Sequence, residues 1–206
     1  MPVIGVDFDN TIVSYDDVMH ETAQQFGLIE SSMKKNKKAI RDYIRQLPDG
    51  ELQWQKLQTF VYGKAMDRAG IFEGVQEFFH SCQQHKIKVY IVSHKTMYGS
   101  MDQDKTNLRD AALRWMADKK FFETSGFGLS KDQIFFESTR QEKINRIKTL
   151  GCTHFIDDLE ETFREADFPK DIEKILYADY PVDSINNIKA FDTWKGINDY
   201  FFKAKK

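Results

Sequence analysis

Short apolar runs alternate with amphipathic helical patterns along most of this chain. The runs are rich in β-branched and aromatic residues and have the length of buried strands, at residues 3–8, 88–92, 133–136, 154–156 and 174–177. Apolar residues at helical spacing follow at residues 75–82, 108–115, 144–150 and 194–201. This alternation predicts the α/β class, with a five-stranded parallel sheet that carries helices on both faces.

One long segment interrupts the alternation, because residues 15–70 show helical patterning only. Two apolar stripes lie on either side of a turn at residues 48–50, whose sequence is Pro-Asp-Gly. We therefore expect a core domain of residues 1–14 and 71–206, with a small helical insertion of residues 15–70 after the first strand. An insertion at this point lies over the carboxyl edge of the sheet, where open α/β folds bind ligands.

Composition narrows the classes of protein that the chain can represent. The 30 Lys and Arg residues nearly balance the 32 Asp and Glu residues, which argues against nucleic-acid or membrane-surface partners. Two cysteines are too few for a disulfide scaffold. No apolar run approaches the roughly 18 residues of a membrane span, and the N-terminus lacks the pattern of a signal peptide. We expect a cytoplasmic protein, and the sequence indicates no oligomeric state.

Carboxylates follow the first predicted strand directly, in the segment Asp7-Phe8-Asp9-Asn10-Thr11. If the chain stays extended, Asp7, Asp9 and Thr11 point the same way. Like charges that leave an apolar strand raise one another's pKa, and a divalent cation resolves that conflict. The alternative is a turn or helix-cap cluster, since Asp and Asn favour both.

A second acidic pair, Asp157-Asp158, ends the fourth predicted strand. If the fourth strand lies beside the first, the two acidic ends meet at a topological switch point. Mg²⁺ prefers oxygen ligands, so this edge of the sheet is the expected place for magnesium and a phosphate group. The alternative is that Asp157 caps the helix predicted to begin at Leu159.

The segment from Asp7 to Thr11 resembles the first motif of the haloacid dehalogenase (HAD) superfamily, in its DxDxT phosphatase branch. The resemblance implies that Asp7 is the nucleophile and Asp9 the general acid and base. It also implies Mg²⁺ held by Asp7, the backbone carbonyl of Asp9 and Asp158, with Asp157 as a possible further ligand. The implied fold is a Rossmann-like sheet in the order 5-4-1-2-3, with the insertion as a small C1-type cap.

Further positions are similar to the remaining motifs of that superfamily. Ser93 follows the second strand, and the resemblance implies that it binds the phosphoryl group together with Thr11 and a lysine. Three lysines compete for that role, namely Lys131, Lys143 and Lys148. The spacing of Thr139 and Glu142 is that of a capping box, which puts Lys143 in the first turn of a helix and Lys148 farther from the sheet edge. We therefore prefer Lys143.

The function expected from these features is Mg²⁺-dependent hydrolysis of a phosphomonoester through an aspartyl-phosphate. A small soluble metabolite such as a sugar phosphate or a nucleotide is the expected substrate. Alternatives are a phosphotransferase, a phosphonatase or dehalogenase, a DxD glycosyltransferase and a non-catalytic scaffold that binds phosphate or a protein. Whether Asp157, Glu161 or Thr162 supports the metal site stays open, as does the role of the basic run Lys34 to Lys38.

Overall fold

The computed structural model describes residues 1–99, 104–178 and 187–203. By their contacts these residues form two compact units. The first comprises Met1–Val13, Ile71–Lys95 and Lys119–Lys206, and the second comprises Ser14–Gly70 and Thr96–Asp118. The chain passes between the units four times, and two of these passages fall within short strands, β2 (Val13–Ser14) and β3 (Gly70–Ile71), which pair with each other.

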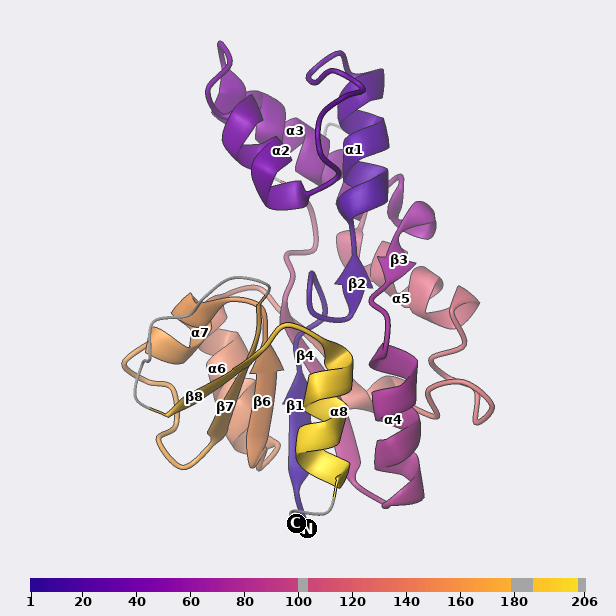
Figure 1. Ribbon diagram of the computed structural model, residues 1–206, viewed down its shortest axis with the longest axis vertical. Coiled ribbons are helices and arrows are strands. Elements are labelled where there is room, and N and C mark those ends of the chain that lie inside the picture. The colour runs from indigo at the N-terminus through magenta and orange to yellow at the C-terminus, as the bar shows by residue number, and fades with distance from the viewer. Residues whose placement is uncertain (100–103, 179–186, 204–206) are drawn as a thin grey trace. The chain divides into compact units, whose positions relative to one another are not determined.

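The first unit is built on a six-stranded sheet (Figure 1) in the order β5-β4-β1-β6-β7-β8. The strands are β1 (Val3–Val6), β4 (Lys88–His94), β5 (Ile134–Glu137), β6 (His154–Asp157), β7 (Glu173–Tyr177) and β8 (Ile188–Phe191). Every neighbouring pair is parallel. The predicted order of five strands is confirmed, and the sixth strand, β8, extends the sheet at one edge.

One face of the sheet packs against α6 (Arg140–Thr149) and α7 (Glu160–Arg164). Side chains from alternate strand positions, such as Tyr90, Val92 and Phe155, form a single buried cluster with Ile144 and Ile147 of α6. Because each strand points successive side chains to opposite faces, this cluster uses only every second residue of a strand. At the ends of β1 and β6 this face continues with Asp7 and Asp157, and both contact Lys143 of α6.

The opposite face packs against α4 (Val75–Gln84) and α8 (Trp194–Phe202). Phe78 of α4 and Trp194 of α8 have ring centroids 5.2 Å apart. The indole N–H of Trp194 donates to the carbonyl of Thr11 at 2.8 Å, which fixes the loop that follows β1. Both faces of the sheet are thus covered, as the continuous apolar character of the strands predicts.

The second unit is helical, with α1 (Asp16–Gln25), α2 (Lys37–Ile44), α3 (Gly50–Tyr62), a short 3₁₀ turn at Met66–Arg68 and α5 (Leu108–Asp118). Trp115 of α5 is buried, and its indole N–H donates to the carbonyl of Ala69 at 2.9 Å. Segment 96–118 therefore groups with the insertion, whereas the sequence placed it in the core domain. Within the described ranges, none of the helices combines the length and the apolar character required to cross a bilayer.

Candidate active site

Asp7 is the first residue after β1, and it lies beside the carboxyl end of β6. Its backbone N–H donates to the carbonyl of Ile156 at 2.8 Å. Strand alternation puts Asp7 on the same face as Gly5, which is the face that α6 covers. A Cβ atom at Gly5 would lie 2.5 Å from the ring of Phe155 on β6, so glycine is needed for the two strands to lie side by side here. The side chain of Asp7 is buried as a result.

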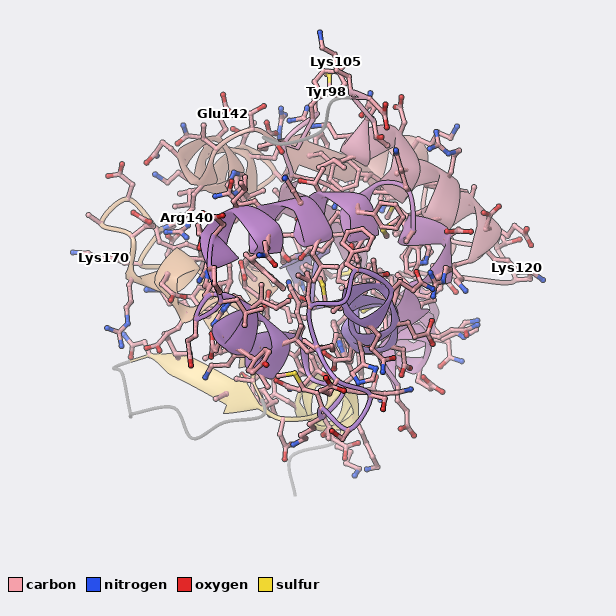
Figure 2. The ribbon with its side chains drawn as sticks, turned by 90° about the horizontal axis from the view of Figure 1, so that it is seen from above. Tyr98, Lys105, Lys120, Arg140, Glu142 and Lys170 are labelled. Atoms are coloured by element: carbon pink, nitrogen blue, oxygen red, sulfur yellow. The ribbon has the colours of Figure 1, made fainter. Side chains whose placement is uncertain are left out.

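Lys143 reaches this carboxylate from the first turn of α6. The predicted capping box is present, because the Thr139 side chain accepts from the N–H of Glu142 and the Glu142 carboxylate accepts from the N–H of Thr139. It fixes the start of the helix at Arg140, the end of α6 that Figure 2 labels with Arg140 and Glu142. The buried ammonium of Lys143 donates to Asp7 Oδ1 at 2.6 Å and to Asp157 Oδ2 at 2.7 Å.

The two aspartates at the end of β6 contact different residues, Asp157 contacting Lys143 and Asp158 contacting Thr11. Asp157 faces Lys143, and its other oxygen accepts the backbone N–H of Leu159 at 2.9 Å. This bond closes the turn before α7 and is not a helix cap, because Leu159 is itself the N-cap residue of α7 and that cap has no side-chain hydrogen bond. Asp158 pairs with Thr11, whose hydroxyl accepts from the N–H of Asp158 at 3.1 Å and lies 3.2 Å from its carboxylate. Thr11 therefore ties the loop after β1 to the loop after β6.

The extended chain predicted through Asp9 is not found, because Asp9 lies beyond the end of the strand. β1 ends at Val6, and Asn10 adopts a left-handed conformation with φ of 62° that turns the chain back toward Val13. The Asp9 carboxylate is held instead by Lys95, whose ammonium lies 2.9 Å from each of its oxygens. The sequence favours an ordinary loop residue at Lys95, because its only local signal there is its position two residues after Ser93; the structure brings it to the site.

The electrostatic balance around Asp7 is negative. Burial raises the pKa of the Asp7 carboxyl to about 7; Lys143 opposes this rise and Asp157 adds to it. Burial alone would lower the pKa of Lys143, but Asp157 and Asp7 raise it above its ordinary value, so the ammonium stays charged. One ammonium shared by two carboxylates cannot neutralise both of them.

These carboxylates fit a divalent cation. Asp7, Asp157 and Asp158 each offer an oxygen, and these oxygens lie within 4.8 Å of one another. When all are ionised, these three carboxylates and the ammonium of Lys143 sum to a formal charge of −2. An all-oxygen donor set with this charge suits Mg²⁺, a hard cation that takes a few carboxylates and keeps several waters. Lys143 bonds to one oxygen of Asp7 and Thr11 to one oxygen of Asp158, whereas both oxygens of Asp157 accept hydrogen bonds, from Lys143 and from the N–H of Leu159.

The other residues predicted from the sequence differ in their burial. Ser93 is buried in β4 near its carboxyl end. Lys131 and Lys148 are exposed, so Lys143 is the one of the three candidates that the fold brings to Asp7. Glu161 is also exposed, whereas Thr162 is buried in α7.

The basic run of the insertion lies on the surface of the second unit. Lys35 forms an exposed ion pair with Asp17 at 2.8 Å. The ammonium of Lys37 donates to the Tyr62 hydroxyl at 2.5 Å and lies 5.8 Å from the ring centroid of Tyr15.

Neither a protein-family model nor a curated protein matches the sequence, but solved structures resemble the fold. A haloacid dehalogenase-like family hydrolase from Streptococcus pneumoniae has a TM-score of 0.61 at 14% identity, over 98% of both chains. A HAD hydrolase of family IA from Entamoeba histolytica has a TM-score of 0.57 at 14% identity, over 95% of both chains. A HAD family hydrolase from Deinococcus radiodurans, with bound phosphate and sodium, has a TM-score of 0.52 at 12% identity, over 98% of this chain and 95% of that one.

Proposed function

We propose that this chain, which has the fold of the HAD-superfamily hydrolases, is a Mg²⁺-dependent phosphomonoester hydrolase that acts through an aspartyl-phosphate. One observation carries the proposal: a buried aspartate at a strand end is paired with a buried lysine, inside a cluster of three carboxylates whose oxygens lie within 4.8 Å of one another. Carboxylates held this close oppose one another's ionisation, and a divalent cation relieves that repulsion.

Asp7 is the nucleophile in this proposal. Its carboxylate oxygen attacks the phosphorus atom, and the bond from phosphorus to the leaving oxygen breaks. The Asp7 backbone is fixed by its hydrogen bond to Ile156, and the carboxylate is oriented by Lys143 at 2.6 Å, so the attacking atom is placed before substrate binds. A bound Mg²⁺ would supply electrostatic stabilisation of the charge on the transferring phosphoryl group.

Asp9 supplies the proton in the same scheme. It protonates the leaving alcohol in the first step and accepts a proton from the water that hydrolyses the aspartyl-phosphate in the second. That water attacks the phosphorus atom, inorganic phosphate leaves and the Asp7 carboxylate is regenerated. Thr11, Ser93 and Lys143 are the proposed ligands of the phosphoryl oxygens.

The proposed substrate is a small phosphorylated metabolite, either a sugar phosphate or a nucleotide. The helical insertion after β1 supports this choice, because the chain enters it directly from the carboxyl end of a parallel strand, where open α/β folds bind ligands. The Deinococcus hydrolase, a protein of the same fold, contains bound phosphate, which is the product that the proposed reaction would release. The cytoplasmic location expected from the sequence stays a prediction.

The test is release of inorganic phosphate from an aryl phosphate, followed by a panel of phosphorylated metabolites, with and without Mg²⁺. We expect activity that EDTA abolishes and that Asp7→Asn lowers by at least about a thousandfold. Asp171→Asn, an exposed change in the same unit, is the control. A wild-type protein that releases no phosphate from any substrate without an added alcohol acceptor would favour a phosphotransferase or a non-catalytic scaffold.

A further inference from the structure

Lys95 is a buried lysine that forms an ion pair with Asp9. Only 3% of the residue is exposed, and its ammonium lies 2.9 Å from both carboxylate oxygens of Asp9. Burying an ammonium group is unfavourable by several kcal/mol unless an opposite charge compensates it. The two short contacts provide that compensation, so the position of the ammonium and the position of the Asp9 carboxylate are coupled.

The backbone of Lys95 is anchored to the sheet. Its N–H donates to the carbonyl of Glu137 at 2.9 Å, which continues the pairing of β4 with β5 by one residue. The ammonium also lies 5.5 Å from the ring centroid of Phe8, and Phe8 packs edge-to-face on Phe136 of β5. Lys95 is therefore held by rigid parts of the first unit.

Asp9, in contrast, lies in a loop. The strand ends three residues before it, and the left-handed Asn10 follows it directly. A carboxylate in such a loop can rotate about its side-chain bonds, and catalysis by proton transfer requires a donor within hydrogen-bond reach of the leaving oxygen. Two simultaneous contacts to one ammonium restrict that rotation.

We infer that Lys95 is a positioning residue that holds the Asp9 carboxylate in the orientation needed for proton transfer. The inference rests on the proposed function, since it assigns Lys95 a role through Asp9. Lys95 itself then contributes little to binding of the substrate. The expected signature is selective, because an alkyl leaving group needs a proton at departure and a nitrophenyl leaving group hardly does.

The experiment compares kcat/KM for an alkyl phosphate and for p-nitrophenyl phosphate. We expect Lys95→Met to lower the value for the alkyl substrate by about 10- to 100-fold and the value for the aryl substrate by less than about threefold. Lys95→Arg keeps the charge and the two donors, and should hold the alkyl-to-aryl ratio within about threefold of wild type. Lys88→Met, at the exposed start of the same strand, is the control and should change neither value.

A double variant tests whether Lys95 acts through Asp9. In an Asp9→Asn background, Lys95→Met should change kcat/KM for the alkyl substrate by less than about twofold, because the group that it positions has lost its function. Equal losses on both substrates with a raised KM would show instead that Lys95 binds substrate, and additive losses would show that the two residues act independently. Either result overturns the inference.

The proposed function and this inference fail in different ways. A wild-type protein without Mg²⁺-dependent phosphatase activity contradicts both. An active wild type whose Asp9→Asn variant loses alkyl turnover selectively, while Lys95→Met behaves like wild type, contradicts the inference alone. If Lys95→Met does not fold, Lys95→Gln can still donate to one oxygen and carries the same test, with an expected alkyl-selective loss of about fivefold.

Discussion

The charge balance around Asp7 predicts that Asp7→Asn inactivates the protein and at the same time stabilises its metal-free form. The change keeps the shape of the side chain and removes one of the three clustered carboxylate charges. In the metal-free protein the pKa of Asp7 is raised from 3.8 to about 7, chiefly by burial. Ionising Asp7 in the folded state is therefore unfavourable relative to the unfolded chain.

The magnitude follows from that difference. At a pH above both values, a pKa of about 7 against 3.8 corresponds to about 4 kcal/mol of destabilisation by the ionised carboxyl. The pKa of about 7 already includes the attraction and the hydrogen bond from Lys143, so asparagine, which resembles the neutral carboxyl, removes this penalty without a further loss there. The expected gain for metal-free Asp7→Asn is about 4 kcal/mol at pH 8.

The raised pKa of Asp7 also predicts how the stability of the folded protein changes with pH. Between pH of about 4 and about 7 the folded wild type binds more protons at Asp7 than the unfolded chain does, so its stability falls as the pH rises. Asp7→Asn lacks this contribution. The stability advantage of the variant should therefore be small at pH 5 and larger at pH 8.

The assay is urea unfolding in EDTA at pH 5 and pH 8, repeated with MgCl₂. Metal binding to the folded state should stabilise the wild type, by about 2.7 kcal/mol at a hundred times Kd, and should stabilise the variant less. Asp171→Asn, exposed on a turn before β7, should follow the wild type throughout. A metal-free Asp7→Asn variant that is less stable than the wild type at pH 8 would refute the reasoning, because attraction to Lys143 would then outweigh burial.

Three further predictions address the construction of the site. Gly5→Ala should destabilise the protein by about 1–3 kcal/mol or more in urea unfolding, because the added Cβ would lie 2.5 Å from the Phe155 ring. Thr139→Ala should remove the N-cap of α6, a loss of about 1 kcal/mol in the same assay that Thr139→Ser should largely restore. Asp158→Asn should raise the Mg²⁺ concentration needed for half-maximal phosphate release by at least about tenfold, while unfolding in EDTA shows no loss of stability beyond about 1 kcal/mol.

Much of the sheet could be predicted because its central strands are buried on both faces. Such strands have continuous apolar sequences, which are visible without any partner. The edge strand β8 was not predicted because it lacks such a continuous apolar sequence. It contains Lys189 and Ala190 between its end residues Ile188 and Phe191, and both are exposed, so no apolar run marks it.

The capping box shows where local sequence determines a site. Thr139 and Glu142 fix the first turn of α6 by hydrogen bonds among neighbours in the chain, and this is sufficient to prefer Lys143 over Lys148. Local sequence does not determine which of the two units contains α5. Its apolar stripe predicts a helix but not the surface that buries it, and Trp115 proves to bond with Ala69 of the insertion.

The two carboxylates of the first motif show the limit of local reasoning most clearly. Asp7 and Asp9 are two residues apart, and an extended chain would give them the same surroundings. The turn at Asn10 gives them different lysines from distant parts of the sequence: Lys143, which Asp7 shares with Asp157, and Lys95, which lies against both oxygens of Asp9. The Asp7 set is left with negative charge that a divalent cation can balance, whereas the Asp9 carboxylate already faces a cation of the protein. Because surroundings determine whether a carboxylate serves as nucleophile or as proton carrier, the proposed division of roles between these neighbours depends on the two lysines as much as on the motif itself.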